Sequence, residues 1–115
     1  VRDVLFLEDV CSLVELQMGQ ISRFRGDIFN LGGGAANSLS LREGTALLEG
    51  KLGHRTGITV EESVRKGDLP IYFTDNRKGT KHLNWQPVVT LDQGFDKILA
   101  WIRANEDVLK KRYTG

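Results

Sequence analysis

No apolar run in the sequence approaches the roughly 20 residues that a transmembrane helix needs, and no signal peptide is recognisable in it. The sequence also lacks a strong charge of either sign. Sixteen Lys and Arg residues stand against 15 Asp and Glu residues and leave a net charge of +1. Such a balance gives no bulk field that would attract nucleic acid or a membrane surface. We expect a cytoplasmic chain with neither nucleic acid nor a membrane among its partners.

Cysteine and histidine are also scarce. Cys11 is the single cysteine, so it cannot form an internal disulfide, and this fits a reducing compartment. It lies in an apolar pattern with helical spacing, and we expect it to be buried as a small hydrophobic residue. His54 and His82 have no metal-ligand spacing, and we expect both at the surface or its boundary. The sequence therefore predicts no metal site, and no Ser–His–Asp or Cys–His constellation can be assembled.

A glycine-rich stretch suggests the fold class. Residues 28–31 are mostly apolar and favour a β-strand, and Gly32, Gly33 and Gly34 follow at once. Ser40 and Glu43 then form a capping-box pattern that predicts a helix over residues 41–52. A strand, a glycine turn and a helix in this order are typical of α/β architecture. At 115 residues the chain is one domain at most, residues 1–115.

The rest of the chain predicts further short elements on both sides of this unit. Brief strands are expected at residues 3–7, 57–60 and 71–73. Helices are expected at residues 9–18, 75–83 and 91–105, with a frayed helical end over residues 106–113. The prediction is thus an α/β chain of short strands and about four helices. Because strand-like sequence begins directly at Val1 without an initiator Met, we interpret the chain as a fragment of a longer protein.

Two stretches could bind phosphate, and each has a simpler interpretation. The glycines at residues 32–34 could approach a pyrophosphate, but Asn37 stands where the third glycine of a dinucleotide fingerprint is required, which favours a structural turn. The Arg65 guanidinium could grip a diphosphate, and Asp68 could accept from the vicinal hydroxyls of a sugar. A solvated turn is the alternative. No basic stripe accompanies the aromatic residues, so we assign them to packing; these are Tyr72, Trp85 and Trp101.

Four stretches in this order resemble the C-terminal part of an extended short-chain dehydrogenase/reductase, in the family of nucleotide-sugar epimerases and dehydratases. The stretches are VRDVLFLEDV at residues 1–10, IFNLGGG at 28–34, RKGDLPIY at 65–72 and LNWQP at 83–87. The resemblance covers essentially the whole chain. Together with RGD at residues 25–27 and NSLSL at 37–41, it looks most like the CDP-tyvelose (CDP-paratose) 2-epimerase branch of that family.

This resemblance implies a substrate site. In the family, the arginines that match Arg2 and Arg65 contact the diphosphate of a nucleotide sugar. The acid that matches Asp68 meets the ribose, and the aromatic residue that matches Tyr72 borders the sugar. Two guanidinium groups on one diphosphate are chemically reasonable, because charge-assisted hydrogen bonds are about twice as strong as neutral ones.

The resemblance also implies what this chain does not carry. The family binds NAD through an N-terminal glycine fingerprint and uses a Tyr-x-x-x-Lys pair for catalysis. Neither Tyr72 nor Tyr113 is followed by Lys four residues later. We therefore assign no catalytic and no cofactor-binding residue to this chain and expect NAD on the N-terminal part of a homo-oligomeric parent enzyme.

The resulting hypothesis is the C-terminal, substrate-binding portion of a Rossmann-type enzyme. It would bind the nucleotide-diphosphate sugar of an NAD-dependent epimerase similar to CDP-paratose/CDP-tyvelose 2-epimerases. A UDP-sugar 4-epimerase or an NDP-sugar dehydratase of the same family is one alternative. A non-catalytic nucleotide-binding or interaction module is the other.

Overall fold

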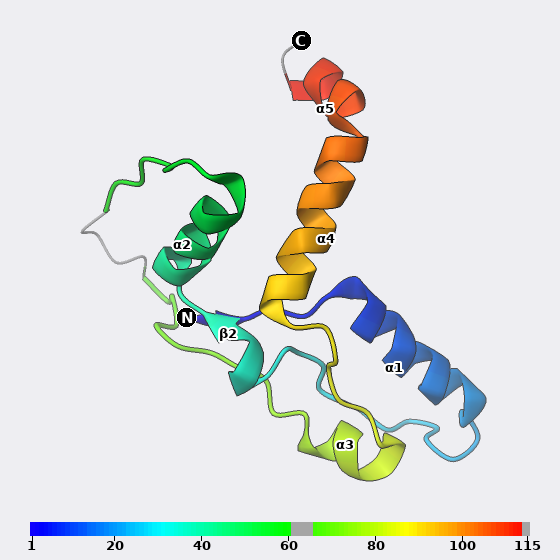
Figure 1. Cartoon of the computed structure of the whole chain (residues 1–115). Coiled ribbons are helices and arrows are strands. Elements are labelled where there is room, and N and C mark those ends of the chain that lie inside the picture. Colours follow the sequence, from blue (N-terminus) through cyan, green and yellow to red (C-terminus); the bar gives the residue numbers. More distant parts are fainter. Residues whose placement is uncertain (61–65, 114–115) are drawn as a thin grey trace.

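The computed structural model describes residues 1–60 and 66–113, and over these ranges the chain is mixed α/β (Figure 1). Five α-helices, one short 3-10 helix and a two-stranded sheet form the described part. In chain order the elements are β1 (Arg2–Asp3), α1 (Leu7–Gly19), η1 (Ala35–Asn37), β2 (Ser38–Leu39), α2 (Leu41–Leu52), α3 (Arg77–Leu83), α4 (Leu91–Ala104) and α5 (Glu106–Tyr113).

Arg2 lies between two other extended segments. Strand β1 pairs antiparallel with β2, and Arg2 stands opposite Leu39. Tyr72 forms a parallel bridge with Arg2, and the Tyr72 backbone N–H donates to the Val1 carbonyl at 3.0 Å. Backbone pairing therefore brings together segments that are far apart in the sequence.

A small core lies between α1, α3 and the segment that follows α3. Its buried apolar residues are Leu13, Leu83 and Trp85. The Trp85 indole Nε1 donates to the Asp9 carbonyl oxygen at 3.2 Å and to Ser12 Oγ at 2.9 Å. A buried indole N–H needs such acceptors, so these bonds fix α1 against the C-terminal end of α3.

The Asp9 side chain forms a second connection from α1. It is only 2% exposed, and its carboxylate oxygens accept from the backbone N–H groups of Val88 at 3.0 Å and Val89 at 3.1 Å. Unpaired N–H groups are costly when buried. Asp9 therefore stabilises the connection between α3 and α4.

The capping box predicted at Ser40 and Glu43 is confirmed, and similar local signals mark other helix ends. Ser40 and Thr90 each form a complete capping box, at the start of α2 and of α4 respectively. Gly53 ends α2 in the left-handed conformation with φ of 73°, and Asn84 does the same after α3 with φ of 51°. The N-cap of α3 is Asn76, one residue after the Asp75 that the sequence favours as a cap, and the Asp75 carboxylate accepts from the Arg77 backbone N–H at 3.0 Å.

All four predicted strands are wrong in whole or in part, and the one expected at residues 71–73 is reduced to a single bridge at Tyr72. The strand expected at residues 3–7 is confined to β1, because α1 already begins at Leu7. Residues 28–31 and 57–60 are not strands, since no described segment pairs with either of them. Instead, Phe29 packs edge-on against Phe24 with 5.4 Å between ring centroids. A strand requires a neighbour with which to share hydrogen bonds, and propensity alone does not provide one.

Three side chains are more exposed than the sequence suggests. Cys11 is exposed, because α1 buries only the face that carries Asp9 and Leu13. Trp101 is 59% exposed and Tyr72 is 49% exposed, so their assignment to packing is wrong. Both histidines are exposed, as predicted.

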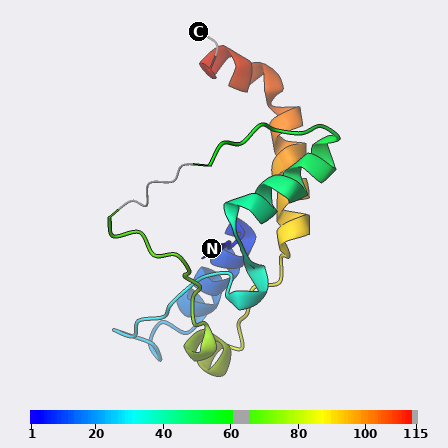
Figure 2. The same cartoon turned by 90° about the vertical axis from the view of Figure 1, so that its left-hand side faces the viewer.

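The molecule is extended for its length. The Cα radius of gyration is 17.6 Å, whereas a compact domain of this size has about 13 Å. Helices α4 and α5 project away from the core, and the segments on either side of residues 61–65 lie far from α1 (Figures 1 and 2). Among the helices described, none has the length and apolar character required to cross a bilayer.

Candidate functional site

Three of the four residues predicted to bind substrate lie together. Arg2 Nη2 donates to Asp68 Oδ1 at 2.6 Å, and Arg2 Nη1 donates to the Leu69 carbonyl at 2.6 Å. The backbone of Tyr72 pairs with that of Arg2. Arg65, the fourth predicted residue, lies outside the described residues. Arg2 and Asp68, 66 positions apart, thus form one polar cluster at the surface.

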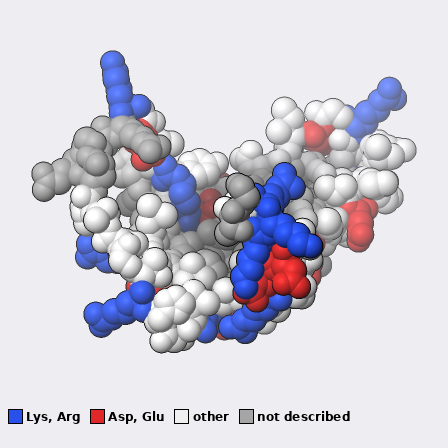
Figure 3. Space-filling view, turned by 90° about the horizontal axis from the view of Figure 1, so that it is seen from above, with Lys and Arg blue, Asp and Glu red and all other residues white. Residues whose placement is uncertain are grey.

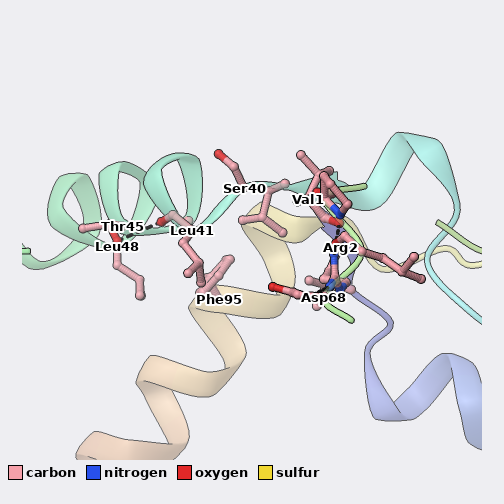
Figure 4. A pocket seen from close by; sticks show the side chains of 13 residues that line it. Val1, Arg2, Ser40, Leu41, Thr45, Leu48, Asp68 and Phe95 are labelled. Carbon is pink, nitrogen blue, oxygen red and sulfur yellow. Dashed lines mark hydrogen bonds and ion pairs between the residues drawn. The ribbon is translucent and has the colours of Figure 1, made fainter. Parts of the chain in front are cut away.

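A cavity of about 520 Å³ opens beside this cluster (Figure 4). Arg2 and Asp68 line its polar end. Leu41 and Leu48 from α2 and Phe95 from α4 lie across the cavity from them. A pocket with a few polar groups beside an apolar wall is typical of small-molecule sites, and this volume lies within their usual range.

Local sequence explains why α2 borders the cavity. β2 pairs with β1 in a register that places Leu39 opposite Arg2. The next residue, Ser40, is the N-cap of α2, and its hydroxyl accepts from the Glu43 backbone N–H at 3.2 Å. The capping box thus turns the chain from β2 directly into α2, so that the first turns of α2 face the cavity.

The glycine turn is filled by the protein itself. A Cβ atom on Gly32 would overlap the side chains of Asp3 and Thr74, and one on Gly33 would overlap the Val4 carbonyl. The Gly34 N–H donates to Asp3 Oδ2 at 2.9 Å. A carboxylate of this chain therefore takes the place that a pyrophosphate would occupy in a dinucleotide loop. The residues around this turn do not fit the NAD diphosphate.

The Asp3 carboxylate, next to Arg2 in β1, forms hydrogen bonds with two other segments of the chain. Its Oδ2 accepts from the backbone N–H groups of Gly34 at 2.9 Å and Thr74 at 3.0 Å. Burial by itself would raise the pKa of the Asp3 carboxyl, but the hydrogen bonds from Thr74 and Gly34 outweigh burial and hold the pKa below its usual value. Asp3 therefore joins the strand that carries Arg2 to the two segments beside it.

Asn76 makes a further connection that sequence analysis did not identify. Its side-chain amide accepts from the Gly32 N–H at 3.2 Å and donates to the Gly32 carbonyl at 2.7 Å. The structural roles of Asp3 and Asp9 were also missed. Each of these three side chains satisfies backbone groups 31 or more positions away in the sequence, and no local pattern marks such contacts.

Charges of both signs are mixed over the rest of the surface. On the face shown in Figure 3, Lys and Arg side chains gather directly beside Asp and Glu side chains. Ion pairs also join α2 to α4, where Lys51 Nζ lies 2.7 Å from Asp92 and 2.6 Å from Asp96. Within residues 1–60 and 66–113, no group of His, Cys, Asp and Glu side chains is arranged to hold a metal ion.

Curated proteins similar to this chain act on nucleotide sugars, as their names state. The chain is 38% identical to CDP-paratose 2-epimerase from Salmonella typhi over 101 residues, which are 88% of this chain and 30% of the relative. It is 31% identical to dTDP-4-dehydro-6-deoxyglucose reductase from Escherichia coli over 104 residues, 89% of this chain and 31% of the relative.

A third relative extends the match over almost the whole chain. UDP-glucuronate 4-epimerase from Thermodesulfobacterium geofontis is 26% identical over 112 residues, which are 95% of this chain and 32% of the relative. No family model matches the chain. The chain spans about a third of the length of each of these relatives. Over that third, the chain is similar to nucleotide-sugar epimerases and to a nucleotide-sugar reductase.

Proposed function

We propose that this chain is the C-terminal, substrate-binding portion of a Rossmann-type, NAD-dependent nucleotide-sugar epimerase similar to CDP-paratose/CDP-tyvelose 2-epimerases. One structural observation carries the proposal. Arg2 and Asp68, chosen from the sequence as substrate-binding residues, form an ion pair that lines a cavity of about 520 Å³, and the backbone of Tyr72 pairs with that of Arg2. The 38% identity with a CDP-paratose 2-epimerase supports the choice among nucleotide sugars.

The proposed roles follow from the chemistry of the side chains. The Arg2 guanidinium contacts the diphosphate, and Arg65 contributes a second guanidinium to it. The Asp68 carboxylate accepts from ribose hydroxyls, and Tyr72 borders the sugar. A planar guanidinium matches the spacing of phosphate oxygens and keeps its charge at all relevant pH values.

The chemistry of epimerisation is assigned to another part of the parent protein. The glycine turn of this chain is occupied by Asp3 and Thr74 and does not fit a dinucleotide. NAD would therefore be bound elsewhere and would supply hydride transfer there. The contribution of the present chain is to hold the nucleotide diphosphate and orient the sugar.

The similarity to a UDP-glucuronate 4-epimerase and a dTDP-sugar reductase supports an alternative within the same family, in which a UDP- or dTDP-sugar is the substrate. Titration of the ¹⁵N-labelled chain with CDP, UDP and dTDP, followed by NMR, separates these options. The main proposal predicts the lowest dissociation constant for CDP, with the largest shifts at the amides of Arg2, Asp68 and Tyr72.

Matched arginine variants provide the control for this titration. Arg2→Ala should weaken nucleotide binding about fivefold or more, the effect of losing about 1 kcal/mol. Arg103→Ala removes an exposed arginine from α4 outside the cavity and should leave binding unchanged. Equal binding by both variants would contradict the proposed site, and preference for UDP or dTDP would favour the alternative substrate.

A further inference from the structure

We infer that Asp68 holds Arg2 in the ligand-free chain, and that diphosphate binding makes the two residues exchange partners. Arg2 would pass from the Asp68 carboxylate to the diphosphate, and Asp68 from Arg2 to the ribose hydroxyls. This inference rests on the proposed function and adds a competition between a carboxylate of the chain and the substrate for one guanidinium group.

The contacts of Arg2 define the ligand-free state. Its Nη2 donates to Asp68 Oδ1 at 2.6 Å, while its Nη1 donates to the carbonyls of Val1 at 2.8 Å and Leu69 at 2.6 Å. Three bonds thus engage the guanidinium, and two of them reach the segment that contains Asp68. The charge that the substrate needs is already neutralised within the site.

The ion pair is accessible to a competing anion. The Arg2 side chain is 48% exposed and that of Asp68 is 57% exposed. Exposed pairs of this kind contribute little free energy because water screens them. A diphosphate carries more negative charge than one carboxylate and presents oxygens that match the guanidinium fork. It can therefore displace Asp68 from Arg2.

Asp68 also affects a ligand before it is displaced. Its carboxylate lies within one hydrogen bond of Arg2, so an approaching diphosphate meets a like charge beside its target. The backbone of Arg2 is fixed by pairing with Leu39 and Tyr72. The exchange therefore needs rotation of two side chains and adjustment around Asp68, but no change in the sheet.

The exchange predicts opposite roles for Asp68 toward two probes. Inorganic pyrophosphate offers only the diphosphate, so Asp68→Asn, which removes the competing charge, should bind it about two- to fivefold more tightly than the original chain. CDP also offers a ribose, and the variant loses the carboxylate that would bind it. The gain for CDP should therefore be smaller than the gain for pyrophosphate.

The experiment is an NMR titration of the labelled chain and its variants with pyrophosphate and with CDP. Asp75→Asn is the matched control, because Asp75 forms a pair of the same kind with Arg77 at 2.6 Å outside the cavity. Its pyrophosphate affinity should equal that of the original chain. Circular dichroism confirms that each variant folds, and Asp68→Ala serves as a second variant.

The possible results separate the inference from the proposed function. The exchange is supported if Asp68→Asn and Asp68→Ala bind pyrophosphate more tightly than the original chain and Asp75→Asn does not. Unchanged or weaker pyrophosphate binding by both overturns it, while a loss of binding in Arg2→Ala would still support the proposed site. If Arg2→Ala binds both probes as the original chain does, the proposed site and the exchange are overturned together.

Discussion

At the scale of single residues, Asp3 connects the proposed site to the rest of the fold. It lies next to Arg2, yet its carboxylate is directed to the backbone of Gly34 and Thr74. The two residues of β1 therefore have different roles. The Arg2 guanidinium lines the cavity, and the Asp3 carboxylate fixes the strand to neighbouring segments.

Removal of the Asp3 carboxylate should destabilise the chain in a pH-dependent manner. Asp3→Ala leaves two partly buried N–H groups without their acceptor, which should lower the free energy of unfolding by about 1–3 kcal/mol at neutral pH. The pKa of Asp3 is lower in the folded chain than its usual value of 3.8. The stabilisation is therefore fully present above about pH 4 and is lost as the pH falls through the folded-state pKa.

Urea denaturation of the original chain and Asp3→Ala, repeated from neutral to acidic pH, measures this effect. The difference in free energy of unfolding should shrink below about pH 4. Asp107→Ala, which removes an exposed carboxylate from α5, should show no such difference. A constant difference across the whole pH range would contradict the assigned role of the carboxylate.

The proximity of three predicted site residues agrees with the sequence-based choice, and their role in binding stays a prediction. Arg2, Asp68 and Tyr72 were selected by resemblance to a family motif, and pairing of their segments brings them together. The roles of Asp9 and Asn76 could not be predicted. Each satisfies backbone groups brought near only by the completed fold, and neither carries a local signature of that role.

At the scale of elements, the glycine turn and helix α2 contain glycines with different structural requirements. A side chain on Gly33 would overlap the Val4 backbone carbonyl, whereas a Cβ atom on Gly50, within α2, would meet open space. Only the first glycine is required by close approach of another segment. The second only weakens the helix.

Substitution of these two glycines by alanine should therefore change stability in opposite directions. Gly33→Ala forces two backbone segments apart and should lower the free energy of unfolding by about 1–3 kcal/mol. Gly50→Ala should raise it by roughly 0.5–1 kcal/mol, because alanine favours a helix. Chemical denaturation of both variants measures the two changes. A shift of the same sign in both would contradict the close approach at the turn.

Helices could be predicted more accurately than strands, and the reason is physical. The capping boxes at Ser40 and Thr90 and the left-handed ends at Gly53 and Asn84 depend on residues within one turn of each other. A strand depends on a partner that is distant in the sequence. The apolar residues 28–31 have strand propensity, but no described segment pairs with them.

At the scale of the whole molecule, the chain exposes more apolar surface than a compact domain would. Its radius of gyration is 17.6 Å, and its buried apolar core consists of Leu13, Leu83 and Trp85 within the described residues. The mixed α/β class could be predicted from the alternation of strand and helix signals. The extended shape could not, because amphipathic patterns show which faces are apolar but not whether another segment covers them.

The central claim is that residues far apart in the sequence act on one nucleotide diphosphate. Two of them are Arg2, at the polar end of the cavity, and Arg65, assigned by resemblance and outside the described residues. The most direct test is a double-mutant cycle that measures CDP affinity for the original chain, Arg2→Ala, Arg65→Ala and the double variant, with Arg103→Ala as the control. We predict a five- to tenfold loss for each single variant, about 1–1.4 kcal/mol. The fold-loss of CDP affinity in the double variant should differ from the product of the two single fold-losses, because both arginines bind the same diphosphate. An unchanged affinity in either single variant, or strictly independent losses, would contradict a shared diphosphate site.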